Sequence, residues 1–146
     1  MTIRNLDALF EPQAIALLGA SNREGSVGSV LARNLFGSGF AGPVMPVNPH
    51  ERAIRSSVNF RSVADLPIAP DLAVLATPAP SVPGLVSELG ERGCRAAVVI
   101  SEGFAEPAMR QALLDAARPH LLRIVGPRCL GVMSPGRGVN ASFAHL

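Results

Sequence analysis

The sequence contains no tryptophan and no tyrosine, and aromatic residues make up only 4% of its 146 positions. Its arginines are scattered along the chain and form no basic cluster. Proteins that bind nucleic acids combine a basic patch with aromatic side chains that stack on bases. We therefore expect no nucleic-acid partner, although the net charge is +2 and the isoelectric point is near 9.0.

Cysteine and histidine are scarce, with two and three residues respectively. Cys94 and Cys129 lie far apart and have no metal-binding spacing with His50, His120 or His145. This pattern predicts no metal site. Cys94 is expected to be a buried or incidental thiol, whereas Cys129 belongs to a motif described below.

Long hydrophobic runs are also absent. No apolar stretch approaches the roughly 20 residues that cross a bilayer, and the first residues lack the apolar region of a signal peptide. These features predict a cytoplasmic protein with no membrane partner. The composition, 48% hydrophobic and 16% charged, is that of a folded chain, and 146 residues suffice for one domain with a sizeable core.

Short apolar runs recur along the chain and alternate with helical patterns. Because successive residues are apolar, the runs suit strands that are buried on both faces of a parallel sheet. The expected strands are residues 14–18, 44–47, 72–76, 96–100 and 123–125. The expected helices are residues 27–36, 81–92 and 106–120, with one further turn at 62–66. This rhythm predicts an α/β fold, a Rossmann-like doubly wound and mainly parallel sheet with helices on both faces.

The two ends of the chain are less regular. Residues 6–12 are expected to pack across the sheet, with Leu9 and Phe10 as anchors. Residues 135–138 form a turn, and residues 139–143 have the pattern of a strand that is just beginning. We interpret residues 1–146 as one domain, the N-terminal part of a longer protein.

Residues 14–28 are the most informative stretch. They predict a buried strand, a turn of small residues, and a helix that opens at Ser26 or Val27. Such a turn presents unpaired backbone N–H groups at the positive end of the helix, where a phosphate is stabilised. Glycine allows a positive φ there and places no side chain against the ligand. Strand–turn–helix units also carry glycines for packing alone, and that alternative stays open.

The predicted strands all end in short polar segments rich in glycine, proline, serine, threonine or asparagine. In an open parallel sheet, ligands bind beyond the carboxyl ends of the strands, where the strand order reverses. Turn chemistry explains part of this composition without any ligand. The five polar tips on one edge nevertheless favour a binding cleft.

The residues argue against NAD as the ligand of this cleft. Ser21 stands where the second glycine of a dinucleotide fingerprint is expected, and no acidic residue follows the second strand to bind a ribose. Asn48, Pro49 and His50 stand there instead. His50 or the nearby Arg52 is expected to meet a phosphate, which favours a nucleotide with an extra ribose phosphate, such as coenzyme A. An NAD(P)-type domain and a non-catalytic regulatory module with a degenerate pocket remain the alternatives.

Four segments together carry a resemblance to a known family. They are residues 19–28, 47–49, 100–104 and 126–131, and residues 140–143 add to the match. The chain resembles the CoA-binding domain of the NDP-forming acyl-CoA synthetases, the superfamily of the succinyl-CoA synthetase α subunit. The family usually has a lysine where this chain has His50, and an asparagine where it has Arg128.

The resemblance implies a site for CoA or an acyl-CoA. The turn after the first strand would hold the CoA phosphates, and the segment from Gly126 to Gly131 would open a helix whose N-terminus faces the reacting phosphate and thioester. No catalytic and no metal-ligating residue is expected. The implied cofactor-binding residues are Gly19, Ser21, Asn22, Arg23, Glu24, Gly25, Val27, Asn48, Pro49, His50, Arg52, Thr77, Pro78, Ile100, Ser101, Glu102, Arg128 and Cys129.

The resemblance also implies partners for this domain. In such ligases, a histidine in a following domain is phosphorylated and an ATP-grasp unit loads it. Neither His120 nor His145 fits that histidine, so the chain alone is expected to bind CoA without catalysing the reaction. The parent would be an ADP-forming acyl-CoA synthetase or its fusion to a GNAT-type acetyltransferase, and a homo-oligomer is possible.

Overall fold

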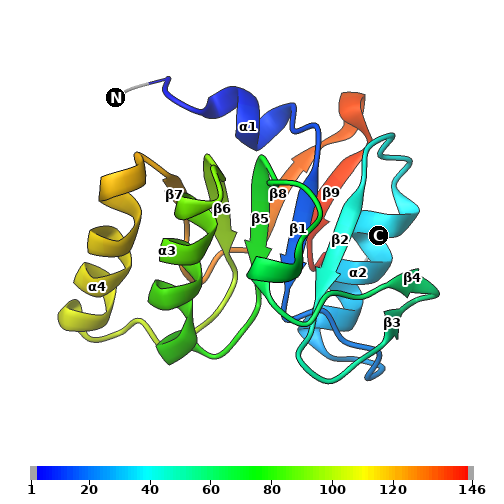
Figure 1. Ribbon diagram of the computed structural model, residues 1–146, viewed down its shortest axis with the longest axis horizontal. Helices are drawn as coiled ribbons and strands as arrows, with labels where there is room; N and C mark the ends of the chain where they lie inside the picture. Colours follow the sequence, from blue (N-terminus) through cyan, green and yellow to red (C-terminus); the bar gives the residue numbers. More distant parts are fainter. Residues whose placement is uncertain (1–2, 145–146) are drawn as a thin grey trace.

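The computed structural model describes residues 3–144, which form a parallel five-stranded sheet with helices on both faces (Figure 1). The strand order is β2–β1–β5–β6–β7. The bounds are β1 (Ile15–Leu18), β2 (Val44–Val47), β5 (Leu72–Leu75), β6 (Ala96–Val99) and β7 (Arg123–Val125). The predicted strands are therefore confirmed within one residue at each end, and so is the predicted fold class.

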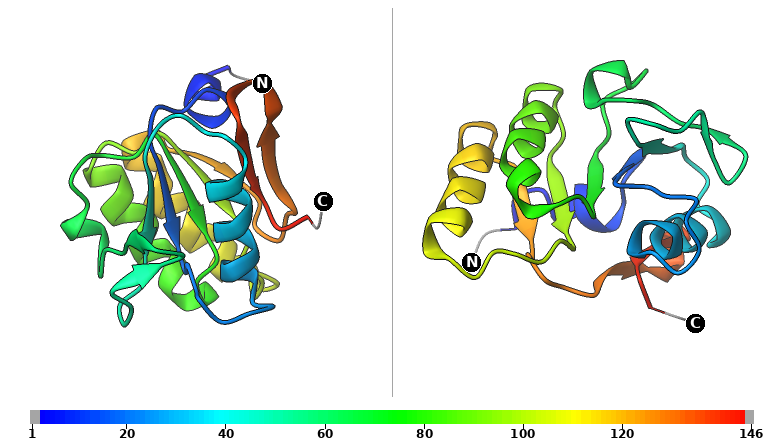
Figure 2. Two further views of the ribbon diagram at one scale, coloured as in Figure 1. Left: turned by 90° about the vertical axis from the view of Figure 1, so that its right-hand side faces the viewer. Right: turned by 90° about the horizontal axis from the view of Figure 1, so that it is seen from below.

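The side chains of each strand alternate between two separate cores. One core holds Ala16, Leu18, Leu75 and Val99 and packs against α3 (Val82–Glu91) and α4 (Pro107–Ala117). The other core holds Ile15, Leu17, Val74 and Val98 and packs against α2 (Val27–Gly37). Figure 2 shows α2 on the opposite side of the sheet from α3 and α4. Because both faces are covered, β1, β2, β5 and β6 are apolar at every position, whereas the edge strand β7 begins with Arg123.

The strand order reverses between β1 and β5. From β1 the chain passes through α2 to β2 at the edge of the sheet, and it then returns to β5 on the other side of β1. The next two crossovers, through α3 and α4, cover the opposite face. The crevice expected at such a switch point therefore lies above the carboxyl ends of β1 and β5.

Two antiparallel hairpins complete the fold, and the sequence did not predict either in full. The first joins β3 (Ala53–Ile54) and β4 (Ser57–Val58), and the second joins β8 (Gly131–Ser134) and β9 (Val139–Ser142). The second hairpin packs on α2 through β9, which carries the predicted C-terminal strand. Its end is fastened by the buried side chain of Asn34, which donates to the carbonyls of Ser142 and Ala144.

The short helix α1 (Leu6–Phe10) lies at the amino-end edge of the sheet, away from the switch point (Figure 1). Ala8 and Leu9 are buried there, whereas Phe10 is 42% exposed, so the prediction of Phe10 as an anchor is wrong.

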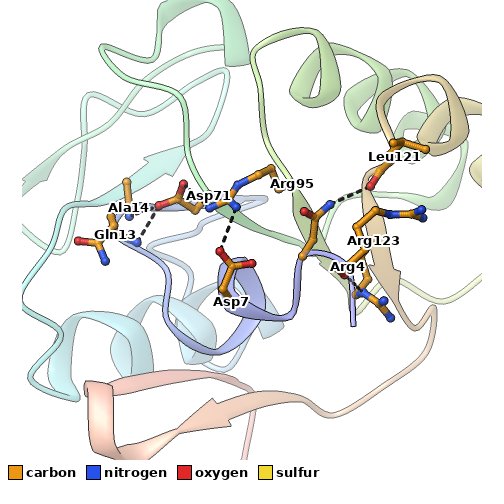
Figure 3. Close-up of polar contacts among 9 residues, drawn as sticks. Arg4, Asp7, Gln13, Ala14, Asp71, Arg95, Leu121 and Arg123 are labelled. Atoms are coloured by element: carbon orange, nitrogen blue, oxygen red, sulfur yellow. Dashed lines mark hydrogen bonds and ion pairs between the residues drawn. The ribbon is translucent and has the colours of Figure 1, made fainter. Parts of the chain in front are cut away.

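Polar contacts tie the N-terminal segment to this edge (Figure 3). Arg95 bridges the carboxylates of Asp7 and Asp71, at 3.1 and 3.4 Å. A second oxygen of Asp71 accepts from the amides of Gln13 and Ala14, at the start of β1. The hydrogen bond to Arg95 is the main reason that the pKa of Asp7 lies below its ordinary value.

Four single-turn 3₁₀ segments complete the description, namely η1 (Val63–Asp65), η2 (Ala79–Ser81), η3 (Arg118–His120) and η4 (Pro135–Arg137). The first corresponds to the helical turn that was predicted at residues 62–66. Within residues 3–144, none of the helices has the length and apolar character needed to cross a membrane.

Gly28 sets how closely α2 approaches the end of β1. A Cβ at this position would lie 2.0 Å from the carbonyl oxygen of Gly19, which is backbone and cannot move freely. We expect Gly28→Ala to lower the free energy of unfolding by about 1–3 kcal/mol, as overpacking does. Urea denaturation measures this change.

Gly84 provides the matched control, since it also lies in the first turn of a helix but has open space around a built Cβ. Gly84→Ala should raise stability by about 0.5–1 kcal/mol, because alanine loses less conformational entropy in a helix. Equal effects of the two substitutions would contradict the close approach at Gly28.

Candidate functional site

The register of the sheet brings four strand tips to one level. Leu18 pairs with Val47 and with Leu75, and Leu75 pairs with Val99. The residue after each of these strands lies at the same edge, as is required for one ligand to contact several tips. Backbone bonds hold the tips together, because the amide of Gly19 donates to Val47 and those of Ala76 and Ile100 donate to the neighbouring strands.

Two clefts open at this edge, and the tip of β5 lies between them. Both are lined by Ala76, Thr77 and Pro78. The first, which we call the α2-side cleft, has a volume of about 580 Å³. The second, the α3-side cleft, has a volume of about 590 Å³. Each is within the size range of small-molecule and cofactor sites in proteins.

The α2-side cleft contains eight of the eighteen predicted residues. They come from the start of α2 and from the tips of β5, β6 and β7, namely Val27, Thr77, Pro78, Ile100, Ser101, Glu102, Arg128 and Cys129. Ala76, Leu130 and Phe143 also line it and were not predicted. Val27 and Leu130 are 44% and 55% exposed, so they give this cleft an apolar rim.

The α3-side cleft contains the tips of β1 and β2 and the segment that leads to β5. Among the predicted residues it includes Gly19, Pro49, Thr77 and Pro78. The residues that sequence reasoning missed are Leu18, Val47, Arg61, Ser62, Val63, Ala76, Ser81, Leu85 and Glu88. The predicted helical turn at residues 62–66 was the only signal that this segment packs against the sheet.

The loop from Gly19 to α2 borders both clefts, since Gly19 lines one and Val27 the other. The helix α2 begins at Val27, where it was predicted to open, and Ser26 caps it, because the Ser26 Oγ accepts from the amide of Ser29 at 3.2 Å. In the described part of the chain, the amides of Gly25, Val27 and Gly28 have no hydrogen-bond partner. These amides at the start of a helix are suited to a phosphate group.

Several predicted binding residues instead hold the backbone of the site. Asn48 donates to the carbonyl of Ala20 and accepts from the amide of His50, both at 2.8 Å. Buried Ser101 donates to the carbonyl of Thr77 and thereby joins the tips of β5 and β6. Their side chains are thus already engaged in shaping the edge.

The remaining predicted residues lie beside the clefts without lining them. They are Ser21, Asn22, Arg23, Glu24, Gly25, Asn48, His50 and Arg52. Most of them are exposed, on the loop after β1 and on the segment after β2. They surround the tips of β1 and β2, so a ligand that leaves the clefts at that point would meet them.

The predicted helix after Gly126 is wrong, because the chain turns there and continues as strand β8. The amide of Arg128 donates to the carbonyl of Ser101, which holds the turn against the tip of β6. The following residues pair with β9 in a hairpin that covers α2, so tertiary pairing decides their conformation. No helix dipole therefore acts on a ligand at this turn.

Arg128 lies in the left-handed region of the backbone map, with φ of 54°. Arginine adopts this conformation at a cost, whereas asparagine tolerates it better than most residues. We expect Arg128→Asn to raise the free energy of unfolding by about 0.5–1 kcal/mol, as measured by urea denaturation. Arg61→Asn, at an exposed arginine whose φ is not positive, is the control and should give no increase. A destabilised Arg128→Asn protein would show that the side chain outweighs the backbone cost.

Neither cysteine is an activated nucleophile. Burial raises the pKa of Cys94 to about 12, so this thiol stays protonated, as its predicted role as a buried thiol requires. Burial also raises the pKa of Cys129, whose Sγ lies 3.5 Å from the carbonyl oxygen of Val99. Among the described residues, no group of three or more His, Cys, Asp or Glu side chains is arranged to hold a metal ion.

The sequence of this protein matches the CoA binding domain family over residues 13–135. The chain belongs to that family. The matched region includes both clefts except for Phe143, and the ligand of the family is coenzyme A. The alternatives of an NAD(P)-type domain and a degenerate regulatory module are not favoured.

Relatives and solved structures agree with this assignment. The chain is 36% identical to an ADP-forming acetate–CoA ligase of Archaeoglobus fulgidus, over 98% of this chain and 22% of that protein. It is 39% identical to a trans-feruloyl-CoA synthase from an unknown prokaryotic organism, over 97% of this chain and 21% of that protein. The dinucleotide-forming acetyl-coenzyme A synthetase 1 of Candidatus Korarchaeum cryptofilum, in complex with phosphate and ADP, superposes with a TM-score of 0.92.

The Korarchaeum structure is 34% identical and is matched over 96% of this chain and 31% of its own. The chain thus spans about a fifth to a third of the length of these relatives. It is therefore homologous to one domain of ADP-forming acyl-CoA synthetases, as the resemblance implied.

Proposed function

We propose that one CoA molecule lies across the tip of β5 and occupies both clefts. Its pyrophosphate would lie at the loop from Gly19 to α2, where the unpaired amides of Gly25, Val27 and Gly28 are found. The observation that carries this proposal is that the loop borders both clefts at the switch point of the sheet. An elongated ligand with a central diphosphate suits such a divided site.

The chemistry of the two clefts supports a direction for the ligand. The α2-side cleft has an apolar rim of Val27, Leu130 and Phe143 and contains Cys129 at its β7 end, which suits the pantetheine arm and its thioester. The α3-side cleft lies beside Pro49 and Arg61, on the segment after β2, which suits the adenosine end. Of the predicted binding residues, those at the tips of β6 and β7 would then contact the pantetheine.

We infer that residues 1–146 act as the CoA-binding domain of an ADP-forming acyl-CoA ligase, with further domains supplying nucleotide and phosphate transfer. The relatives named as an ADP-forming acetate–CoA ligase and a trans-feruloyl-CoA synthase, of which the chain spans about a fifth, support this inference. A partner subunit could carry the same domains, since one Pyrococcus furiosus relative, 34% identical, is named as an α subunit. Fusion to an acetyltransferase domain stays a prediction.

Isothermal titration with CoA and with NAD tests the ligand class. We expect CoA to bind at least ten times more tightly than NAD, because the tip of β2 offers Asn48 where a ribose-binding acid would stand, and the Asn48 side chain is engaged by the backbone. NAD binding as tightly as CoA would contradict the proposal. Heat release from neither ligand would instead favour a module with a degenerate pocket.

A further inference from the structure

The arginines without a side-chain partner gather at the ligand edge of the domain. All 13 permanently charged basic residues are arginines, because the sequence has no lysine. Within residues 3–144, the structure shows no hydrogen bond or ion pair for the guanidinium groups of Arg23, Arg33, Arg52, Arg55, Arg61 and Arg128. Only Arg33 lies in a helix, and the other five lie on loops that follow the carboxyl ends of strands.

Three of these arginines lie on one segment, residues 48–61, which joins β2 to η1. This segment also contains His50 and a single acidic residue, Glu51, so it carries an excess of positive charge. The loop after β1, which faces it, adds the neighbouring charges of Arg23 and Glu24. The excess of unpaired cations is therefore greatest beside the tips of β1 and β2.

Hydrogen bonds and a β-bridge fix this segment against the sheet. Buried Asn59 donates to the carbonyls of Asn48 and Glu51, at 2.8 and 2.7 Å. Phe60 forms a parallel bridge with Val47 at the outer edge of β2. The β3–β4 hairpin is thereby held in a defined place over the edge of the sheet.

Asn22, which lies on the loop from Gly19 to α2, connects this loop to the hairpin. Its Nδ2 donates to the carbonyl of Ala53 at 2.9 Å, and its Oδ1 accepts from the amide of Arg55 at 3.2 Å. Both polar atoms of the Asn22 side chain therefore bond to the backbone of the hairpin. The turn at Arg55 and Ser56, both with positive φ, is thus fixed beside the loop that follows β1.

We propose that the hairpin of residues 53–58 recognises the 3′-phosphate of CoA, with Arg55 as its ion-pair partner and Asn22 as the residue that positions it. This inference rests on the proposed placement of CoA. A phosphate monoester carries more negative charge than either phosphate group of the diphosphate. It therefore attracts a guanidinium strongly. The diphosphate has backbone amides within reach, whereas the monoester at the adenosine end would lie nearest the residues that follow β2.

Arginine is also the appropriate residue for this role. Its charge does not change across the accessible pH range, and its planar group makes two parallel hydrogen bonds to a phosphate. The sequence predicted His50 or Arg52 for the 3′-phosphate. Arg55 differs from both because its backbone amide is hydrogen-bonded to Asn22, on the loop from Gly19 to α2.

The test measures the dissociation constants of CoA and of 3′-dephospho-CoA by isothermal titration at low salt. Wild-type protein should bind CoA at least ten times more tightly. Arg55→Gln, which keeps a polar side chain and removes its charge, should reduce this ratio about tenfold and leave dephospho-CoA binding unchanged. Asn22→Ala should reduce the same ratio, since the turn that carries Arg55 is released.

Arg118→Gln is the matched control, because Arg118 is exposed and lies at the opposite end of α4 from the site. It should leave both constants unchanged. Arg52→Gln separates the two candidate partners. If Arg52→Gln removes the preference for CoA and Arg55→Gln does not, or if Arg55→Gln weakens both ligands equally, the proposal is wrong.

Failure of this proposal is distinguishable from failure of the proposed function. Equal binding of CoA and dephospho-CoA by the wild type would refute recognition by Arg55 and leave CoA binding intact. Absence of binding for both ligands would refute the placement of CoA itself. If the Asn22→Ala protein fails to fold, Arg55→Gln decides, because the Arg55 guanidinium forms no hydrogen bond or ion pair within residues 3–144.

Discussion

Replacing Gly25 by valine is expected to weaken CoA binding at least tenfold, about 1.4 kcal/mol. Gly25 is exposed at the loop after β1, and no heavy atom beyond its two chain neighbours lies within 4 Å of a Cβ built there. The branched side chain would therefore occupy the space in which the pyrophosphate approaches the backbone amides. Isothermal titration of the folded variant measures the loss.

The substitution also strains the backbone, and this effect needs a control. Gly25 has φ of +80°, a conformation that costs a β-branched residue about 1–2 kcal/mol. Gly93 has φ of +96°, is equally exposed and has equally open surroundings, but it follows α3 at the opposite edge of the sheet. Gly93→Val should lower stability by a similar amount and leave CoA affinity unchanged. Equal CoA affinity in the two variants would refute the placement of the pyrophosphate.

The isolated 146-residue chain is expected to show no ATP turnover in the presence of CoA and an acid, and no label from γ-labelled ATP. Within residues 3–144, no histidine lines either cleft, and His120 belongs to η3, where its ring is next to Gly90 of α3. His145 lies outside the described residues. We expect the isolated chain to lack turnover altogether, because it spans only 22% of its Archaeoglobus relative.

Joining the domain to the rest of a ligase should restore turnover. A suitable protein is the Archaeoglobus ligase with its matching region replaced by this chain, which is 36% identical there. The same chimaera with Gly25→Val is the control and should show a raised KM for CoA. Phosphorylation of any histidine in the isolated chain would overturn this assignment of roles.

The sequence predicted the sheet well because most of its strands are buried on both faces. The strands β1, β2, β5 and β6 are therefore apolar at every position, which makes them visible as short apolar runs. It did not predict the β3–β4 hairpin, whose turn is formed by Arg55 and Ser56 rather than by glycine or asparagine. It also did not predict β8, because its pairing with β9 depends on contacts with α2 that no local pattern reveals.

The candidate site was predictable in position more than in detail. The strand tips were expected to meet, and the register brings them to one edge. The individual roles of polar side chains were not predictable, because an asparagine can bind a ligand or the backbone with the same groups. Asn22 and Asn48 both contact the backbone. The apolar rim at Leu130 and Phe143 depends on the hairpin that follows β7 and so was missed as well.

The most direct test of a CoA molecule that spans both clefts is an NMR titration of the ¹⁵N-labelled domain with CoA. The account predicts that the amides of Gly25 and Val27 shift together with residues of the α2-side cleft, such as Ser101 and Cys129, and of the α3-side cleft, such as Arg61. The chemical shifts of amides in α1 and η3, at the opposite edge of the sheet, should not change. Shifts confined to one cleft, or largest at the opposite edge, would contradict the account.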